Sequence, residues 1–505
     1  MHGETLLKRQ NVGVQDHAAE QKGFTVRVKD NSRVVGYEVT ADATGLTGRA
    51  GLGLVAETAK AIGLTSGLSA AVGGARSWAL HDPGKVLRDV ALTLADGGDA
   101  LRHMTVIDRQ PVLFGTVASP ATACRTIVAV AEDAEAMAGL AAARAAARER
   151  AWRAGAAPPS VKVAWGMASA EVAGDGADEP LTVDLDATLI VAHSDDKDGA
   201  GKTYKRTWGH HPLNAYLDRG DGHGESLAGL LRPGNAGANN AKDHITVFEQ
   251  ARAQLPDLPH SLRRLVRADT AGATHDFLDH VVGLADTAGE RWQFSVGFPI
   301  TADVRDAIRA VDDNAWVPAT RQNGQIRDKA YVAEITAADT IDVTGWPEGA
   351  RLLVRKEPLH PGAQQTLDDI DGCRFTAFLT DQPEDDLALL DTRHRGHARV
   401  EDRIRAGKDT GMRTLPCDTF ARNHLWLQLV LLAQDLLTFT QTLGFEPGEL
   451  RAAEPQQLRY KVLHTPARII RHARRIRLDL LADWPWADQI VAAFDRLRAL
   501  PVPAD

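Results

Sequence analysis

The chain has 505 residues, of which 44% are hydrophobic, so it is long and apolar enough for about three globular domains with sizeable cores. Its 58 Lys and Arg residues against 67 Asp and Glu residues give a net charge of −9, which excludes a uniformly basic surface and allows only local basic patches. Three widely spaced cysteines argue against a disulfide framework. The first residues lack the apolar run of a signal peptide, and no segment has the apolar length of a membrane span. We therefore expect a cytoplasmic protein with no membrane partner.

Residues 1–175 are expected to form a mainly helical region that ends in a linker. Residues 52–64 and 86–94 carry apolar residues at intervals of three and four, which is one face of a helix. Short helices joined by glycine-rich turns suit a domain that binds the ends of DNA. The acidic, glycine-rich run at 173–180 is typical of a linker, so we place a domain boundary near residue 175.

From residue 181 the pattern changes to short strands and helices. Strands are predicted at 181–192, 211–217, 226–231 and 264–268, and helices at about 239–255 and 273–284. Asp186 lies in the first of these strands, and Asp269 directly follows the last. Acids at the ends of adjacent strands match a ribonuclease-H-like fold, in which a third carboxylate lies on a later helix. The predicted class is α/β, a mixed sheet flanked by helices, with residues 176–295 as the first part of this core.

The third acid is expected on a helix at residues 395–413, which are rich in alanine, arginine and isoleucine and contain no proline. Residues four and seven positions apart share one face of a helix. The residues of that face are His394, His397, Glu401, Arg405 and Lys408. One carboxylate among four potential cations suits a metal ion with DNA phosphates beside it, and the alternative is an exposed helix with salt-bridge spacing. Residues 386–505 form the second part of the core in this interpretation.

Asp186, Asp269 and Glu401 together carry the predicted chemistry. Three carboxylates brought together by a fold can hold two Mg²⁺ ions, or Mn²⁺ in their place, over a phosphodiester. The ions stabilise both the attacking and the leaving oxygen. Asp184 points to the same strand face as Asp186, so spacing alone leaves either of the two as a ligand.

The interval between Asp269 and Glu401 is longer than a bare core needs. Strand-like segments fall in it at 293–297, 331–335, 351–355 and 374–379. This pattern predicts a mostly β insertion over residues 296–385, after which the chain returns to the core.

Two further places in the sequence are candidates for phosphate contact. Residues 459–477 contain no acid, and we expect Arg468, Arg471 and Arg475 to contact DNA there, unless the segment is a solvated helix face that pairs with acids elsewhere. Arg232 precedes a loop that leads into a helix near residue 239, so Arg232 and the free amides of that helix could receive a phosphate. A plain connecting loop is the alternative.

Two motifs resemble other classes of site. Residues 199–203, Gly-Ala-Gly-Lys-Thr, resemble the end of a phosphate-binding loop, but Asp196 stands where that pattern requires glycine. The segment 184–188, Asp-Leu-Asp-Ala-Thr, resembles the first motif of haloacid-dehalogenase-type phosphatases, with Asp184 as the nucleophile and Asp186 as its acid/base partner. We find no convincing downstream magnesium motif of that class, so the phosphatase is the less favoured alternative.

As a set, the motifs resemble the bacterial insertion-sequence DDE transposases of the 1380 family. The segments that carry the resemblance are Asp-Ala-Thr at 186–188, Lys-Arg-Thr-Trp-Gly-His-His-Pro-Leu at 205–213, Leu-Leu-Arg-Pro-Gly-Asn-Ala-Gly at 230–237, Arg-Ala-Asp-Thr-Ala-Gly at 267–272 and Arg-Val-Glu-Asp-Arg-Ile-Arg at 399–405. The resemblance covers roughly residues 80–490, and 184–240 is its most specific part.

The resemblance implies cut-and-paste DNA transposition by a homodimer that binds terminal inverted repeats and target DNA, with Mg²⁺-dependent strand cleavage and strand transfer. It places Asp186, Asp269 and Glu401 at the family's acidic triad, and Lys408 at the lysine that follows the glutamate. Related groups carry a tyrosine and an arginine before the glutamate, where this chain has His394 and His397. An inactive or domesticated relative that only binds DNA is the alternative from a different class of function.

Overall fold

The computed structural model describes residues 39–76, 80–167, 179–192, 194, 196–359, 362, 369–472 and 475–501. The chain divides into two units, Met1–Thr44 and Gly45–Asp505, and every element discussed below belongs to the second unit. The predicted domain boundary near residue 175 lies outside the described residues.

The first part of this unit is helical, as the apolar spacing predicts. Its longer helices are α1 (Leu52–Ala61), α2 (Leu64–Val72), α3 (Pro83–Ala95), α6 (Pro120–Ala131) and α7 (Ala134–Ala151). Helices α3 and α6 both start with proline, which fits the first helical position. The residue before each proline is a cap, because Asp82 accepts the Lys85 N–H and Ser119 accepts the Thr122 N–H. Local hydrogen bonding therefore determines where these helices begin.

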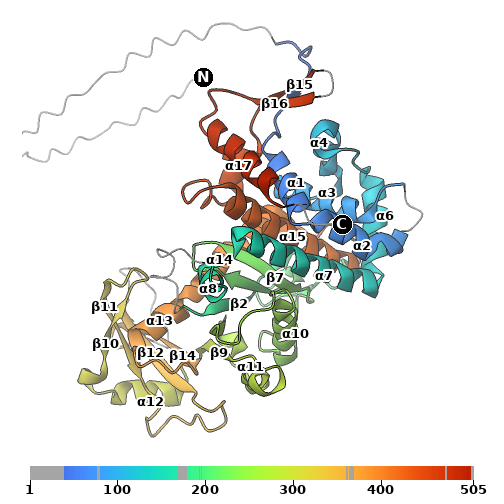
Figure 1. Cartoon of the computed structure of the whole chain (residues 1–505). Coiled ribbons are helices and arrows are strands. Elements are labelled where there is room, and N and C mark those ends of the chain that lie inside the picture. The colour runs from blue at the N-terminus through green and yellow to red at the C-terminus, as the bar shows by residue number, and fades with distance from the viewer. Residues whose placement is uncertain are drawn as a thin grey trace, which may run out of the picture. The chain divides into compact units, whose positions relative to one another are not determined.

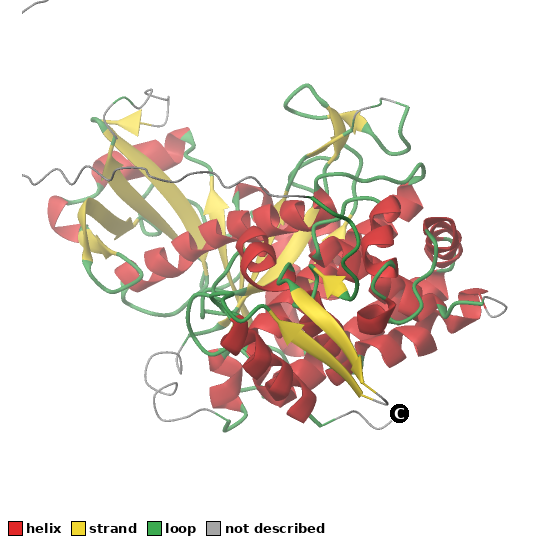
Figure 2. Cartoon of the chain, turned by 90° about the horizontal axis from the view of Figure 1, so that it is seen from above, coloured by secondary structure: helices red, strands yellow, loops and turns green. Residues whose placement is uncertain are grey.

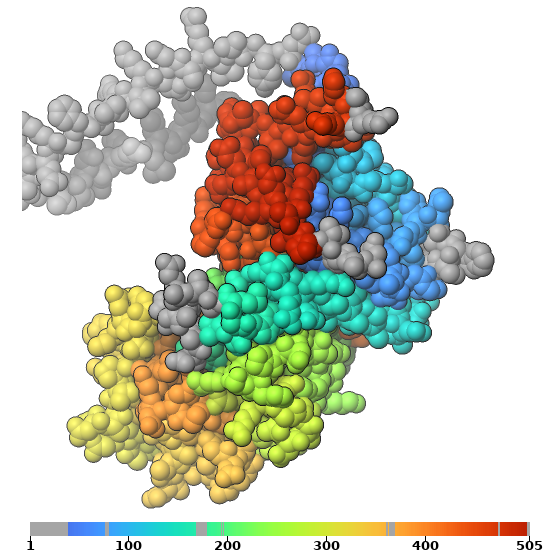
Figure 3. Space-filling model, in the orientation of Figure 1, coloured from blue at the N-terminus to red at the C-terminus, as the bar shows by residue number. Residues whose placement is uncertain are grey.

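Two later helices complete the helical region. Helix α15 (Phe420–Gly444) is buried along most of its length because residues 425–437 are apolar nearly all round, and it contacts α1, α3 and α6. Helix α17 (Ala487–Ala499) packs against α1 and α15. In Figure 3 the blue and cyan residues of the first part lie directly against the red residues of the last part. The helical region is thus built from segments far apart in the sequence.

A ten-stranded mixed sheet forms the centre of the molecule. Its strand order is β10-β11-β12-β14-β9-β8-β2-β6-β7, with β13 paired to β14 off this path. The core strands are β2 (Leu181–Ala187), β6 (Leu213–Asp218), β7 (Gly224–Leu230), β8 (Arg264–Ala268) and β9 (Trp292–Phe298). Strands β2, β8 and β9 run parallel, whereas β6 and β7 are antiparallel to their neighbours. Helices α10 (Ala241–Arg252) and α11 (His275–Thr287) pack against it, and helices flank its strands in Figures 1 and 2. The predicted α/β class with a flanked mixed sheet is confirmed.

The same sheet continues beyond β9 into the predicted β-rich segment. The added strands are β10 (Val317–Thr320), β11 (Ile326–Glu334), β12 (Arg351–Pro358) and β14 (Cys373–Thr380), all antiparallel to their neighbours. Strand β14 pairs with β9, and helix α12 (Ala302–Ala310), which was not among the predicted elements, precedes β10. The segment is therefore an extension of the core sheet and not a separate one.

The continuous helix predicted for residues 395–413 is wrong. The chain forms α13 (Leu387–Arg395), a 3₁₀ turn (Gly396–Ala398), α14 (Arg399–Gly407) and a π turn (Lys408–Met412). Arg267 enters at the first break, where its Nη1 donates to the Arg393 carbonyl, and a Cβ on Gly396 would lie 2.3 Å from that nitrogen. At the second break Gly411 takes φ 98°, a value that favours glycine. His394 and Glu401 therefore lie on different helices.

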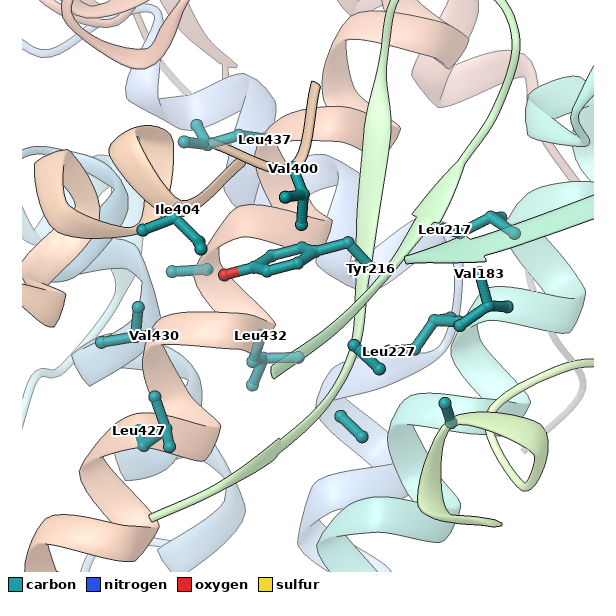
Figure 4. Close-up of a cluster of buried hydrophobic side chains, with 14 of the residues drawn as sticks. Val183, Tyr216, Leu217, Leu227, Val400, Ile404, Leu427, Val430, Leu432 and Leu437 are labelled. Atoms are coloured by element: carbon teal, nitrogen blue, oxygen red, sulfur yellow. The ribbon is translucent and has the colours of Figure 1, made fainter. Parts of the chain in front are cut away.

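Alternation along the strands decides which side chains meet α14. Tyr216 on β6 points towards Val400 on α14, whereas Leu217 points to the opposite side of the sheet (Figure 4). Tyr216 pairs with Asp184 in the β2–β6 register, and Asp186 lies on the same face two residues further on. The two aspartates of β2 are therefore on the face that α14 covers.

Two small sheets accompany the large one. The first has the order β3-β5-β4, from β3 (Ile190–Val191), β4 (Gly201–Lys202) and β5 (Trp208–His210). The second has the order β1-β15-β16, from β1 (Leu46–Thr47), β15 (Ala467–His472) and β16 (Arg475–Leu480). Residues 467–472 and 475–477 of the acid-free segment 459–477 thus belong to a β-hairpin. The alternative of a solvated helix face is wrong for these residues, because they form strands.

Candidate active site

Asp186 and Asp269 lie side by side at the carboxyl ends of two neighbouring strands. Strands β2 and β8 are parallel, and Leu185 pairs with Ala268, so the next residue of each strand is one of the two acids. Both acids line one cavity of about 760 Å³. Asp269 also caps the short turn after it, because its Oδ1 accepts the Ala271 N–H at 2.9 Å. Parallel pairing thus brings together two acids that are distant in the sequence.

Glu401 approaches this pair from helix α14. Val400 is buried against the sheet face that carries Asp186, whereas Glu401 is exposed. Burial raises the pKa of Asp186 to about 6, and the charges of Asp269 and Glu401 act in the same direction. Such repulsion is felt only at short range, so the three carboxylates share one electrostatic environment.

The side chains that the structure describes form no ready-made metal cage. Among the residues that the structure describes, no three His, Cys, Asp or Glu side chains are grouped closely enough to hold one metal. Mg²⁺ usually takes one or two protein carboxylates and fills its other positions with water and phosphate. Asp186, Asp269 and Glu401 are the carboxylates that would hold such ions, and the charges of the other two acids both act on Asp186.

Asp184, the other candidate on the same strand face, is fully engaged inside the protein. Its Oδ1 and Oδ2 accept hydrogen bonds from Arg267 Nε and Nη2, both at 2.8 Å. His397 Nδ1 lies 2.9 Å from the same Oδ1. Burial alone would raise the pKa of Asp184, but Arg267 and His397 lower it to about 2. A buried carboxylate held in this way is available neither as a nucleophile nor as a metal ligand, so the phosphatase alternative loses its nucleophile.

Two predicted DNA contacts lie in the interior. His394 is buried, and its ring stacks on Phe378 with the centroids 4.4 Å apart. Arg232 is buried too and donates from Nε to the His211 carbonyl at 2.9 Å and from Nη1 to Asp243 at 3.2 Å. The predictions that His394 and Arg232 contact DNA are wrong, because the first packs in the core and the second supports the cavity wall at His211.

His397 and Lys408 border the acids. His397 contacts Asp184, and its charge opposes the effect of burial on the pKa of Asp186. Burial lowers the pKa of Lys408, the charge of Lys205 adds to this effect, and Asp186 opposes it. Lys408 therefore lies near both the acids and a second lysine.

The remaining predicted DNA contacts are at the surface. Arg405 is exposed and pairs with Asp402 at 2.8 Å and Glu454 at 2.7 Å. The cations of the β15–β16 hairpin, Arg468, Arg471 and Arg475, are all exposed. The structure places Lys408 near Asp186 and Arg405 one helical turn after Glu401 on α14, while the three hairpin arginines belong to a separate sheet.

Sequence reasoning missed the wall of the cavity that faces the acids. Lys202, Tyr204, His211 and His244 line it together with Asp186 and Asp269. Burial lowers the pKa of His211 and of His244, which favours neutral rings. A signal was present, because residues 199–217 contain no acid, as in the basic segment near the C-terminus.

Residues 31–502 match the protein family described as Transposase DDE domain group 1. The chain belongs to this family. The protein is thus a DDE transposase, a phosphoryl-transfer enzyme of DNA transposition, and the predicted resemblance is confirmed at this level. Transposases bind DNA, and DDE transposases generally use divalent metal ions.

Two further findings concern the transposase. No curated protein matches its chain. Within the described residues, none of its helices combines the length and the apolar character needed to cross a membrane.

Proposed function

We propose that this transposase binds the terminal inverted repeats of an insertion sequence and cuts and rejoins DNA there, with Asp186, Asp269 and Glu401 as ligands of two Mg²⁺ ions. The observation that carries the proposal is the shared environment of the three acids, in which the pKa of Asp186 rises to about 6 through burial, Asp269 and Glu401. Unpaired acids this close repel each other, and divalent cations are what would stabilise them.

The topology supports the finer assignment of the fold. The order β7-β6-β2-β8-β9, with β6 antiparallel to β2 and with β2, β8 and β9 parallel, is that of a ribonuclease-H-like core. The acids stand at the ends of its two central strands and on a later helix, and the β extension lies between the second and the third. The sequence resemblance to the 1380 family of insertion-sequence transposases adds to this proposal that a homodimer is the active form.

Each of the nearby side chains has a role in this proposal. Bound Mg²⁺, or Mn²⁺ in its place, would neutralise the charge that develops on the phosphodiester during in-line attack. Asp186, Asp269 and Glu401 would hold these ions. Arg267 and His397 hold Asp184 ionised next to the site, and Lys408 offers a positive charge to a phosphate oxygen.

Strand cleavage by purified protein tests the proposal. The substrate is DNA that flanks the gene, with Mg²⁺, and the variants are Asp269→Asn and Asp402→Asn, the latter an exposed acid beside Glu401 on α14. We expect Asp269→Asn to bind this DNA and leave it uncut, while Asp402→Asn cuts like the unchanged protein. A protein that shifts the DNA in a gel but never nicks it would instead be the DNA-binding relative without activity.

A further inference from the structure

The β-hairpin formed by β4, β5 and the turn between them, residues 201–210, covers the cavity that holds Asp186 and Asp269. Lys202, Thr203 and Tyr204 of this hairpin line the same cavity as the two acids. The motif that resembles a phosphate-binding loop ends in β4 and is followed by a turn and a strand, so it does not open a helix. The hairpin therefore needs another explanation than nucleotide triphosphate binding.

Two aromatic side chains of the hairpin face solvent. Tyr204 is 73% exposed and Trp208 44% exposed. The Tyr204 ring has only loose neighbours, with the His211 ring centroid at 6.1 Å and Lys205 Nζ at 5.7 Å from the ring centroid. Exposed aromatic rings beside a site of phosphoryl transfer are suited to stacking on bases, since every base offers a flat face.

The cations of the hairpin have no ion-pair partner in the part of the chain that the structure describes. Lys202, Lys205 and Arg206 form no ion pair with any of the described residues, and the same is true of Lys408. Lys205 is close enough to Lys408 for its charge to lower the pKa of Lys408, which burial also lowers. Like charges held together next to a pair of acids indicate that an anion lies between them in the working complex.

The base of the hairpin is closely packed. A Cβ on Gly234 would lie 2.3 Å from the carbonyl oxygens of both Gly201 and Gly209. A Cβ on Gly199 would lie 2.1 Å from the Phe420 ring at the start of α15. These contacts pack the base of the hairpin closely against the Gly234 loop and the start of α15.

We propose that this hairpin binds one strand of DNA, unpaired at this point, beside the scissile phosphate, with Tyr204 stacked on a base and with Lys205 and Lys408 on its phosphates. The inference rests on the proposed function, because it assumes that the acids act on DNA. The ligand is unpaired because a base inside a duplex has both faces covered by its neighbours, whereas a terminal or displaced base leaves one face free. A cavity of about 760 Å³ has the size of a site for one small ligand such as a nucleotide.

Fluorescence of 2-aminopurine tests the stacking. The probe is a duplex of the element end with 2-aminopurine next to the scissile phosphate, in Ca²⁺ to prevent cleavage. We expect binding to quench the fluorescence for the unchanged protein and for Tyr204→Phe, and not for Tyr204→Ala. Tyr331→Ala is the matched control, because Tyr331 is also an exposed tyrosine, with Lys356 Nζ 5.5 Å from its ring centroid.

Cleavage assays separate this inference from the proposed function. In Mg²⁺ we expect Tyr204→Ala to cut a fully paired end roughly tenfold more slowly, with recovery on an end whose last pairs are mismatched. For Lys205→Ala we expect the slope of the logarithm of the binding constant against the logarithm of the salt concentration to fall by about the amount that one phosphate contact contributes. Quenching and cleavage that are unchanged in Tyr204→Ala overturn the inference and leave the proposed function standing. An unchanged protein that cuts no end overturns the proposed function itself.

Discussion

Two clusters of charged side chains in this protein are built in opposite ways. In the first, which joins α7 to β7 and α15, Arg148 Nε lies 2.9 Å from Glu225 and its Nη2 lies 2.7 Å from Asp435. Arg144 and Arg219 add further bonds to the same two acids, and all five side chains are buried. In the second cluster, Asp186, Asp269 and Glu401 lie close together, and no ion pair to any of them is found among the described residues.

The difference separates charges that stabilise the fold from charges kept for a ligand. A fully buried carboxylate without a cation is costly, so the acids of the first cluster need their arginines, whereas Asp186 is half-buried and Asp269 and Glu401 are exposed. The first cluster contains its own cations and ties the helical region to the sheet. The second cluster has no cations paired with its acids among the described residues. Strand β2 carries both arrangements, because Asp184 is paired with Arg267 and Asp186 is not.

The largest expected effect is on strand cleavage. Glu401→Gln removes one of the three unpaired charges while keeping the shape of the side chain. We expect cleavage to fall by about a thousandfold or more, because the transition state loses a metal ligand, with DNA affinity nearly unchanged. Gel assays of nicking and binding measure the two quantities. Near-normal cleavage by this variant would remove Glu401 from the site.

The second prediction concerns the paired cluster. Arg148→Met leaves Glu225 and Asp435 short of a cation in a buried place, so we expect the free energy of unfolding to fall by about 3–5 kcal/mol. Chemical denaturation measures it. Arg309→Met is the control, since the Arg309–Asp306 pair is exposed and should contribute less than about 0.5 kcal/mol. Equal losses of unfolding free energy in the two variants would mean that the buried ion pairs of Arg148 contribute no more than the exposed Arg309–Asp306 pair.

The third prediction concerns the stability of the unpaired cluster without metal. The pKa of Asp186 rises in the folded state to about 6 from 3.8, so its protonation stabilises the fold fully below pH 3.8 and this contribution is lost as pH rises to about 6. Asp186→Asn carries no charge to lose. In EDTA at pH 7.5 we expect it to be more stable than the unchanged protein by about 1–3 kcal/mol, and equally stable near pH 4.

Metal ions should reverse that order. Addition of Mg²⁺ stabilises whichever protein binds it, so the melting temperature of the unchanged protein should rise while that of Asp186→Asn stays constant. Thermal unfolding at several concentrations of Mg²⁺ measures this. A rise of the same size in both proteins would mean that the ions bind elsewhere.

The smallest expected effect lies on the β15–β16 hairpin. Its exposed Arg468 resembles the unpaired acids in that no ion pair to it is found among the described residues. Arg468→Ala should weaken DNA binding severalfold. It should also reduce the dependence of DNA affinity on salt concentration by about the amount that one phosphate contact contributes. Arg477→Ala is the control, because Arg477 pairs with Asp479 at 2.7 Å. The same slope in both variants would contradict a phosphate contact by Arg468.

The sequence predicts the elements better than their junctions. Strands β2, β8 and β9 and the buried helix α15 follow from apolar runs, and the pairing of Leu185 with Ala268 then places Asp186 beside Asp269. The break at Gly396 could not be predicted, because it depends on Arg267 arriving from a distant strand. The spacing of residues 394–408 therefore wrongly placed His394 on one helix face with Glu401. Nothing else in the sequence indicates that His394 is buried.

The sequence also does not predict which polar residues are buried. Arg232 and Asp184 look like surface chemistry in the sequence, and only the tertiary structure reveals the partners that engage them. The hairpin at residues 201–210 shows the reverse error, because residues 199–203 resemble only an incomplete phosphate-loop motif and so indicate no site. Charge composition over the acid-free run 199–217 was a better guide than the motif.

Anomalous diffraction from crystals of the transposase bound to its element end in Mn²⁺ tests the central claim most directly. We predict two Mn²⁺ ions about 3.5–4 Å apart, both bound by Asp186, one also by Asp269 and the other also by Glu401. A single ion, or ions bound away from these carboxylates, would contradict the account.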